Sequence, residues 1–455
     1  MKGIFKKILE KKLRFLAKRI LKKYQPDIIA ITGSVGKTST KEAIYTVLSG
    51  KFSCRRNQGN YNNEIGVPLT IIGRSSGGKS PFRWLRVFGR AFRLICLNCP
   101  YPKILVLELA ADKPGDIEYL TDFIPLKVGI VTAIAPVHME FFKTLENIAK
   151  EKSAVITSLP KEGFALINAD DELVLPMKEK TKAAVSTYGL SEQAEVRATD
   201  INLSYGEINP IDGLKRKTIR GLSFKVWHNG STAPFHLLGV LGERLVYTAL
   251  AATAVGLAYG LNLVGISEQL KRFKPPSGRM NLIQGIKNTL IIDDSYNSSP
   301  QAALAALDVL EKINLGEDIP GRVRPEAIEK LPRGGKRFLK FACFGDMAEL
   351  GEFTEKGHAL VGQRTVGVAD VLITVGEKAK IIAKEAIKRG MHEMQIFSFD
   401  FAEEAGRFLQ DRIHKGDVIL IKGSQVSRME KVVKEIMAEP GRAEELLVRQ
   451  SEDWQ

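Results

Sequence analysis

Cysteine is scarce in this chain, which has only four cysteines among its 455 residues. Four cysteines are too few for a disulfide framework in a protein of this length. A cysteine-bound metal is also disfavoured, because Cys96 and Cys99 form a single CxxC pair and no second pair stands at metal-ligand spacing. We therefore expect free thiols in a reducing compartment, the cytoplasm.

Acidic residues are scarce near the N-terminus. Residues 1–100 contain 21 Lys/Arg and four Asp/Glu, a local charge of +17, whereas the whole chain carries +15. The other 355 residues therefore carry a net charge of −2, so the basic character belongs to the N-terminal end. No recognised nucleic-acid motif accompanies this charge, and we expect no nucleic-acid partner.

Two segments, residues 2–24 and 81–95, carry most of this charge. In each, apolar residues recur at helical spacing among lysines or arginines, which is typical of a basic amphipathic helix suited to an anionic membrane surface. Charges interrupt both segments every few residues, so neither is expected to span a membrane, and the first lacks the apolar core of a signal peptide. The alternative is a helix that packs on the protein and presents a solvated charged face.

The chain length indicates about two to four domains. Apolar strands alternate with helical segments from residue 27 to residue 170 and again beyond a linker at 275–278, which predicts an α/β fold with mainly parallel sheets. Residues 195–240 are expected to add antiparallel strands. We expect a basic helix at 1–25, a central domain at 26–275 with a basic insertion at about 74–100, and a second, Rossmann-like domain at 276–455, with strands near 289–293, 338–344, 371–375 and 417–421.

The most informative segment is ITGSVGKTST at residues 31–40. It follows an apolar run that predicts a buried strand and precedes a run with helical spacing, which is the layout of a phosphate-binding loop. Gly33 and Gly36 allow a tight turn, Lys37 is expected to reach the outer phosphates, and the Thr38 hydroxyl is expected to hold Mg²⁺. The backbone N–H groups that face the phosphates come from Gly33, Ser34, Val35, Gly36, Lys37, Thr38 and Ser39. The alternative is a glycine turn before an ordinary helix.

The loop has the short spacing GxxGKT, with Ile31 where the general nucleotide-binding pattern places a further glycine. Other motifs follow in order: NQGNYNNEIGVPLTII (57–72), VLELAADKPGDIEYL (106–120), APVHMEFF (135–142), IAKEKSAVI (148–156), SGRMNLI (277–283), IIDDSYNSSP (291–300), CFGDMAELGEFTEKGH (343–358) and DVILIKGS (417–424). Over residues 26–440 this series resembles the Mur ligases, the amide-forming ligases of cell-wall assembly, and most closely their MurF type.

The resemblance implies a central phosphate-loop ATPase domain followed by a Rossmann-like domain. It also implies that ATP phosphorylates a carboxylate and that an amine then displaces phosphate from the acyl phosphate. For the MurF type, the reaction adds D-Ala-D-Ala to a UDP-muramoyl tripeptide in peptidoglycan precursor synthesis, with ATP and Mg²⁺ as cofactors.

The resemblance assigns roles to four residues of the central domain outside the loop. Glu108 and His138 match metal-site residues, and both follow or end a predicted strand. Lys152 matches a lysine that becomes carbamylated and so places a carboxylate near a second Mg²⁺. Asn60 matches an asparagine close to the metal and the acyl phosphate, while Asn62 and Asn63 are expected to make local turn hydrogen bonds.

The second domain is expected to complete the ATP site. Arg279 matches an arginine that reaches the ATP phosphates, and Asp294 matches an aspartate that holds the ribose. Asn297 is expected to help shape the nucleotide pocket, together with Asp293 and Tyr296. The alternative for this group is a turn at the end of a strand. Lys422 and Ser424 match positions that contact the incoming substrate.

The chain departs from the family pattern in two places. The asparagines that usually contact adenine are absent, and Arg244, Leu245 and Thr248 stand in the aligned segment, so that Arg244 is expected to stack on the base and Thr248 to hydrogen-bond. Only about 25 residues precede the phosphate loop domain, so we expect the usual UDP-binding domain to be missing. The two basic segments lead to the hypothesis that the enzyme works at the membrane surface.

Three alternatives to this interpretation stay open. The first is a Mur-type ligase with another donor, including a membrane-linked one, or another amino-acid acceptor. The second is a membrane-recruited ATP-binding protein without ligase activity, and the third is a nucleic-acid-binding ATPase, which only the charge supports.

Overall fold

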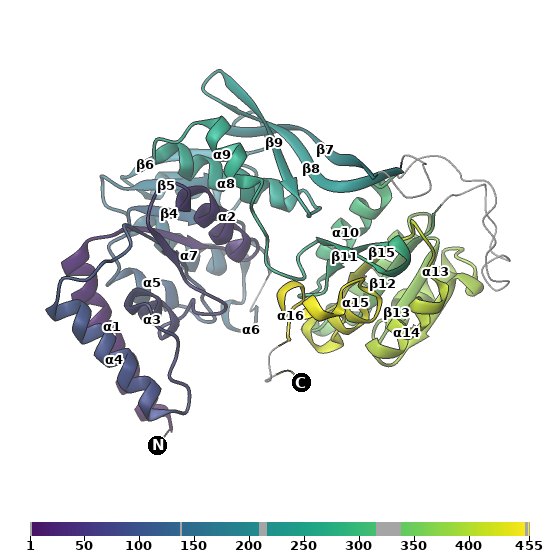
Figure 1. Ribbon diagram of the computed structural model, residues 1–455, viewed down its shortest axis with the longest axis horizontal. Coiled ribbons are helices and arrows are strands. Elements are labelled where there is room, and N and C mark those ends of the chain that lie inside the picture. Colours follow the sequence, from purple (N-terminus) through teal and green to yellow (C-terminus); the bar gives the residue numbers. More distant parts are fainter. Residues whose placement is uncertain (1, 137–138, 209–215, 315–337, 451–453, 455) are drawn as a thin grey trace. The chain divides into compact units, whose positions relative to one another are not determined.

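The computed structural model describes residues 2–136, 139–208, 216–314, 338–450 and 454, and it confirms an α/β fold with mainly parallel sheets (Figure 1). The chain divides into two compact units. Unit 1 comprises Met1–Ile201, Phe224–His236 and Glu243–Lys274, and unit 2 comprises Asn202–Ser223, Leu237–Gly242 and Pro275–Gln455.

The first sheet has the strand order β2-β3-β1-β4-β5-β6-β7-β8-β9. Strands β1 to β6 lie within unit 1, and β7, β8 and β9 are divided between the two units. All pairs from β2 to β7 are parallel. The strands are β1 (Asp27–Thr32), β2 (Cys54–Arg56), β3 (Ile104–Glu108), β4 (Val128–Val131), β5 (Phe164–Asn168), β6 (Ala184–Gly189), β7 (Val196–Ile208), β8 (Arg216–His228) and β9 (Ser231–Leu238). Because β1 lies between β3 and β4, the chain reverses its direction of winding at β1, and such a point is where open α/β sheets bind ligands.

Helices cover both faces of this sheet. They are α1 (Lys2–Tyr24), α2 (Lys37–Ser49), α3 (Gly66–Ile72), α4 (Pro81–Cys96), α5 (Asp116–Thr121), α6 (Met139–Phe142), α7 (Leu145–Thr157), α8 (Arg244–Ala258) and α9 (Leu263–Leu270). Buried residues of α1, α3, α4, α5 and α7 share one core with alternate residues of β1 and β3, because successive side chains of a strand point to opposite faces. Helices α2, α8 and α9 pack together elsewhere in the unit.

The two basic segments form helices, as predicted, and both pack on unit 1. Leu13, Ala17 and Ile20 of α1 are fully buried, and Ala91 and Leu94 of α4 belong to the same core. Among the described residues, no helix combines the length and the apolar character needed to cross a bilayer.

β8 and β9 are joined by the two residues Asn229 and Gly230, which both have positive φ angles. A two-residue loop of this kind is typical of an antiparallel hairpin. The segment at 195–240 therefore adds the antiparallel strands that the sequence predicts.

Unit 2 contains a second sheet with the order β10-β11-β15-β12-β13-β14, in which only the edge pair β10–β11 is antiparallel. The strands are β10 (Asn281–Gln284), β11 (Leu290–Asp294), β12 (Lys340–Gly345), β13 (Val371–Val375), β14 (Ile396–Phe399) and β15 (Val418–Lys422). Helices α14 (Ala402–Arg412) and α15 (Glu430–Ile436) share one core with the sheet, and α10 (Pro300–Lys312), α12 (Thr354–Thr365) and α13 (Lys380–Lys388) share another. The short α16 (Ala443–Leu446) follows near the C-terminus.

Candidate active site

The loop between β1 and α2 depends on two glycines. Gly33 has a φ angle of 145° and Gly36 one of 86°, a region that residues with a Cβ rarely adopt. At Gly33 there is also no space, because a Cβ would lie 1.9 Å from the Thr132 Oγ1 atom, whereas at Gly36 the nearest atom would be 3.9 Å away. The turn therefore needs glycine at both positions, and Gly33 is the more constrained of the two.

Thr132, directly after β4, anchors this loop. Its hydroxyl donates a hydrogen bond to the Val35 carbonyl at 2.6 Å, and the Ser34 N–H donates to the Ala133 carbonyl at 2.7 Å. Asn168, the last residue of β5, donates to the Thr132 carbonyl at 2.9 Å. Three adjacent parallel strands thus fix the loop at their carboxyl ends, the edge where ligands bind in such sheets.

Lys37 begins α2 and folds back over the loop. Its ammonium donates to the carbonyls of Gly33 at 2.7 Å and Ser34 at 3.3 Å. Thr38 and Ser39 follow in the first helical turn, where backbone N–H groups have no acceptor within the helix. These N–H groups, the positive end of the helix dipole and the ammonium together suit a phosphate group.

Glu108 ends β3 beside Ile31 of β1, and its side chain is 3% exposed. Asn57 fixes the Glu108 backbone, because its amide donates to the Glu108 carbonyl and its oxygen accepts from the Glu108 N–H, each at 2.9 Å. Asn62 donates to the Oε1 atom of Glu108 at 3.1 Å. The carboxylate is therefore held in one orientation beside the loop.

The other carboxylate oxygen of Glu108, Oε2, is buried and accepts no hydrogen bond among the described residues. The buried hydroxyl of Thr32 also makes none there. Buried carboxylate oxygens usually accept a hydrogen bond, whereas in the described part of the chain Oε2 has only the ammonium of Lys41 at 3.7 Å. Mg²⁺ binds through one or two carboxylates together with waters and phosphate oxygens. The donor set thus fits Mg²⁺ held by Glu108, although the described residues contain no group of three His, Cys, Asp or Glu side chains arranged for a metal.

Lys41 of α2 is a member of this site that the sequence analysis missed. It is 1% exposed, and its Nζ lies 3.7 Å from Glu108 Oε2 and 3.3 Å from the Glu42 carboxylate. The signal was present, because Lys41 lies three and seven residues before the buried Ile44 and Leu48 and so shares their helix face. A lysine at such a position needs a buried partner.

The structure gives less information about Asn60 and His138 than about the residues described above. Asn60 is exposed and makes no hydrogen bond with other described residues, while Asn62 binds the Glu108 side chain and Asn63 caps the turn before α3. His138 lies outside the described residues. Asn62 thus does more than the local turn bonding expected of it.

Lys152 of α7 is buried, with 3% of its side chain exposed. Burial lowers the pKa of its ammonium to about 7, with the positive charge of Lys37 as the second cause, while Glu151 and Asp112 act in the opposite direction. A large share of such a side chain is the neutral amine at neutral pH. The structure therefore brings together Lys37 and a lysine that is able to act as a nucleophile.

Helix α8 contains the residues that replace the usual adenine contacts. Thr248 is buried, and its hydroxyl donates to the Arg244 carbonyl at 3.5 Å. Tyr247, between them, donates to the Asp170 carboxylate at 2.9 Å. The hydrogen bond expected of Thr248 toward a base therefore competes with one inside its own helix.

In unit 2, Asp294 ends β11 and Lys422 ends β15, and these strands are parallel neighbours. The Lys422 ammonium lies 2.6 Å from Asp294 Oδ2 and donates to the Asn297 carbonyl at 2.9 Å. Asp294 Oδ1 accepts from the Met280 N–H at 3.2 Å. The structure thus brings Asp294, Asn297 and Lys422 together, and Lys422 is only 1% exposed.

Arg279 packs against the loop that follows β11. Its guanidinium lies 4.1 Å from the centre of the Tyr296 ring. The backbone around Tyr296 is held by Arg449, which donates to the carbonyls of Ser295 and Tyr296 and pairs with the buried Glu430 at 2.9 Å. Arg279 and Asp294 are thus carried by one braced segment of unit 2.

Ser424 lies further along, after β15. Its backbone N–H donates to the Asp346 carbonyl at 3.0 Å, and its hydroxyl also donates to that oxygen. The Ala379 N–H donates to the Asp346 side chain at 2.7 Å. Ser424 is therefore tied to the loop after β12 rather than to Lys422.

Comparison with known proteins places this geometry in a family. The model of the Mur ligase middle domain matches residues 31–77 and 96–256, and that of the Mur ligase glutamate ligase domain matches residues 324–425. The chain is 30% identical over 405 residues to UDP-N-acetylmuramoyl-tripeptide–D-alanyl-D-alanine ligase of Mycobacterium leprae, covering 87% of this chain and 71% of that protein. It is 26% identical over 429 residues to the protein of that name in Bacillus subtilis, covering 94% and 79%.

Solved structures that resemble this chain indicate the same family. A crystal structure of MurF from Acinetobacter baumannii superposes with a TM-score of 0.71 at 26% identity, covering 93% of this chain and 79% of that one. MurF ligase from Thermotoga maritima in complex with ADP gives 0.69 at 25% identity, covering 94% and 83%. This chain belongs to the Mur ligase family.

Proposed function

We propose that this protein is an ATP-dependent ligase that adds D-Ala-D-Ala to a UDP-muramoyl tripeptide in peptidoglycan precursor synthesis. One observation carries the proposal: the glycine loop with Lys37, the braced carboxylate of Glu108 and the buried amine of Lys152 lie in one unit. This arrangement supports a phosphate site beside a carboxylate and a lysine that is partly neutral at neutral pH. The curated relatives carry the name of this reaction.

The chemistry requires negative groups to approach one another. The γ-phosphoryl group of ATP is transferred to the tripeptide carboxylate, which releases ADP, and the amine of D-Ala-D-Ala then displaces phosphate to form the amide. The loop N–H groups and Lys37 bind and orient the phosphates, so their contribution is positioning and electrostatic stabilisation.

Mg²⁺ would be held by Glu108 and Thr38, with His138 as a further ligand. It would supply positive charge that offsets the phosphate oxygens. The support is the buried Oε2 atom of Glu108, which accepts no hydrogen bond among the described residues. Asn57 holds the Glu108 backbone, Asn62 binds its Oε1 atom, and Lys41 lies near Oε2. Asn60 would approach the substrate from the exposed side of the loop.

Lys152 would carry a carbamate. In this reaction the neutral amine attacks CO2, one proton is released, and the product is a carboxylate on the lysine nitrogen. A lowered pKa supports it, because only the unprotonated amine reacts. Incubation with ¹³C-labelled CO2 should give a carbamate carbon signal in the nuclear magnetic resonance spectrum that disappears in Lys152→Met. A signal that persists in the variant would contradict the assignment.

Unit 2 would bind the nucleotide through Arg279, Asp294 and Asn297, and Lys422 and Ser424 would contact the incoming substrate. Arg244 and Thr248 of unit 1 would contact adenine. The pairing of Lys422 with Asp294 supports this arrangement, because it fixes the orientation of the aspartate that would hold the ribose. Arg279→Ala should therefore raise the KM for ATP with little change in the melting temperature, since Arg279 forms no ion pair among the described residues.

The decisive experiment measures ADP and phosphate release with a matrix of donors and acceptors. We expect release that requires both the UDP-muramoyl tripeptide and D-Ala-D-Ala, with the amide product seen by mass spectrometry. Release with another carboxylate donor or another amine would assign a different Mur-type ligase. ATP binding without any release would assign an ATP-binding protein, and release stimulated by nucleic acid would overturn the proposal.

The proposed setting is the cytoplasm, with peripheral contact to an anionic membrane through residues 2–24 and 81–95. The support is the basic charge of the two helices, α1 and α4. Such contact would place the enzyme at the inner face of the membrane.

A further inference from the structure

Helix α4 has two apolar faces, although only one of them is buried. Val87, Ala91 and Leu94 face the core of unit 1. Phe82, Leu85 and Phe92 are spaced three and seven residues apart, so they form a second stripe along the helix. Their exposed fractions are 78%, 68% and 68%. A helix that only packs on its own protein carries polar residues on its outer face, so this stripe needs another explanation.

Arginines border the exposed stripe. Arg83, Arg86, Arg90 and Arg93 follow one another at steps of three and four residues, and α4 contains no acidic residue. In the part of the chain that the structure describes, none of the four forms an ion pair. The exposed side of α4 therefore has a stripe of aromatic and aliphatic side chains beside a row of arginines that have no acidic partner among the described residues.

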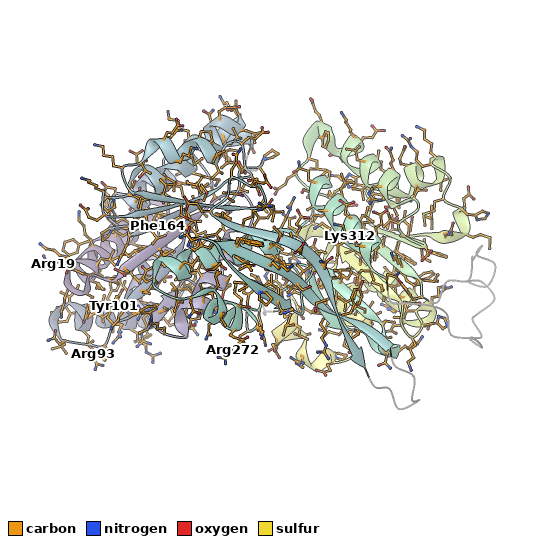
Figure 2. The ribbon with its side chains drawn as sticks, turned by 90° about the horizontal axis from the view of Figure 1, so that it is seen from above. Arg19, Arg93, Tyr101, Phe164, Arg272 and Lys312 are labelled. Carbon is orange, nitrogen blue, oxygen red and sulfur yellow. The ribbon has the colours of Figure 1, made fainter. Side chains whose placement is uncertain are left out.

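Helix α1 extends this surface. Lys23 donates to the carbonyls of Leu94 and Leu97, and Phe15 shares a hollow with Phe88, so α1 and α4 run alongside each other in the same direction. Figure 1 shows the two helices side by side, and Figure 2 places Arg19 of α1 and Arg93 of α4 at the same end of unit 1.

The hollow between the helices is lined by Lys11, Lys12, Phe15, Leu16 and Phe88. Phe15 is 62% exposed. Phe88 lies three residues after Leu85 and four before Phe92, which makes them neighbours on the helix surface. The exposed stripe of α4 therefore continues through Phe88 to Phe15, with Lys11 and Lys12 beside it.

We propose that this outer surface of α1 and α4 docks flat on an anionic lipid bilayer. Phe15, Phe82, Leu85 and Phe92 insert among the acyl chains, and the surrounding arginines and lysines bind lipid phosphates. The inference deepens the membrane contact proposed above, and it stands independently of the ligase reaction.

Two other occupants fit less well. A second copy of the chain would bring two uncompensated rows of arginine together, which is repulsive. A nucleic-acid duplex would match the charge but would leave the aromatic stripe in water, since its bases are stacked on one another and its backbone offers no apolar phase. Single strands stack bases on aromatic rings, but they offer no apolar phase for the aliphatic Leu85. Of these occupants, only an anionic bilayer offers both acyl chains for the apolar stripe and phosphates for the arginines.

The test is flotation of the full chain with vesicles of phosphatidylcholine alone or with phosphatidylglycerol added. We expect flotation only with the anionic vesicles, weakening as salt is raised. A triple substitution of Phe82, Leu85 and Phe92 to serine should reduce the partition coefficient at least ~10-fold. Substitution of Arg83, Arg86 and Arg93 to glutamine should reduce it by roughly 100-fold, at about fivefold per charge.

The matched control replaces Val264, Ile387 and Phe401 with serine. These residues are also exposed and apolar but lie on other helices or loops, and their loss should leave flotation unchanged. Ligase turnover without vesicles should be equal in all four proteins, so a failure of the reaction is recorded separately. Equal flotation of the serine triple variant, or no flotation of the wild type, would overturn the proposal. A dimer of the wild type that the triple variant loses, without flotation, would assign the stripe to self-association instead.

Discussion

The Nζ atom of Lys422 lies 2.6 Å from Oδ2 of Asp294, and both side chains are largely buried at the ends of adjacent parallel strands. Removing one partner of such a pair leaves a charge in a site that excludes water. Lys422→Ala should therefore lower the free energy of unfolding by about 3–5 kcal/mol and should weaken ADP binding. Chemical denaturation and calorimetric titration would measure the two effects.

Two comparisons make this prediction specific. Lys388→Ala removes a lysine whose side chain is 76% exposed and should change stability by less than ~0.5 kcal/mol. The double variant Lys422→Met with Asp294→Asn should recover part of the lost stability, because no lone charge is left. A double variant less stable than Lys422→Ala would show that the pair matters for another reason.

Lys37→Ala should abolish ATP turnover without unfolding the protein. The ammonium donates to two carbonyls of its own loop, so its loss is expected to remove phosphate binding more than stability. We expect kcat to fall at least ~10²-fold, with a melting temperature within a few degrees of the wild type. Lys51→Ala is the control, as an exposed lysine just after α2. Retained turnover in Lys37→Ala would refute the phosphate site.

The two loop glycines should differ in their tolerance of a methyl group. Gly33→Ala places a Cβ against the Thr132 hydroxyl, whereas the Cβ of Gly36→Ala makes only an ordinary van der Waals contact and incurs the strain of its φ angle. We expect Gly36→Ala to cost about 1–2 kcal/mol and Gly33→Ala clearly more. Thermal denaturation and ATP affinity would rank them, and the reverse order would contradict the described loop.

The buried carboxyl group of Asp293 should make the free energy of unfolding depend on pH. Burial raises the pKa of its carboxyl to about 6, from an ordinary value of 3.8. Between these pH values the folded protein binds more protons than the unfolded chain, so stability falls as pH rises from about 4 to about 6. The difference of about two pKa units corresponds to roughly 3 kcal/mol.

Asp293→Asn should remove most of this dependence. Its oxygen still accepts the hydrogen bond from the Ser295 N–H, so the variant should gain stability over the wild type at pH 7 and little at pH 4. Unfolding curves at both pH values would test it. If the free energies of unfolding of the two proteins change equally between pH 4 and pH 7, Asp293 does not titrate in this range.

The elements with the clearest periodicity were predictable from the sequence, and their order in the sheets was not. Strands expected near 289–293, 338–344, 371–375 and 417–421 appear as β11, β12, β13 and β15, with bounds that agree within two residues. β14 was missed because its four residues are only partly buried. That β15 inserts between β11 and β12 depends on contacts distant in sequence, which no local pattern encodes.

The candidate site likewise contains residues that the sequence predicts and residues that only the structure shows. The loop from Gly33 to Ser39 follows from glycine spacing and from the strand before it. Lys41, Asn57 and Asn62 were missed as partners of Glu108, since asparagines are usual in turns and a lysine in a helix is usually solvated. Only the fold shows that these three side chains converge on one residue, Glu108, with Asn57 on its backbone and Asn62 and Lys41 at its carboxylate.

The buried positions of α1 have a further consequence. Leu13, Ala17 and Ile20 belong to the core of unit 1, so removing residues 1–24 would expose apolar surface and unfold the protein rather than detach it from lipid. Many peripheral helices are disordered in water and become ordered on the bilayer, which costs conformational entropy. Here the helix exists beforehand, so adsorption should proceed without a gain in helical circular dichroism and as a rigid body that fixes the orientation of unit 1 above the lipid.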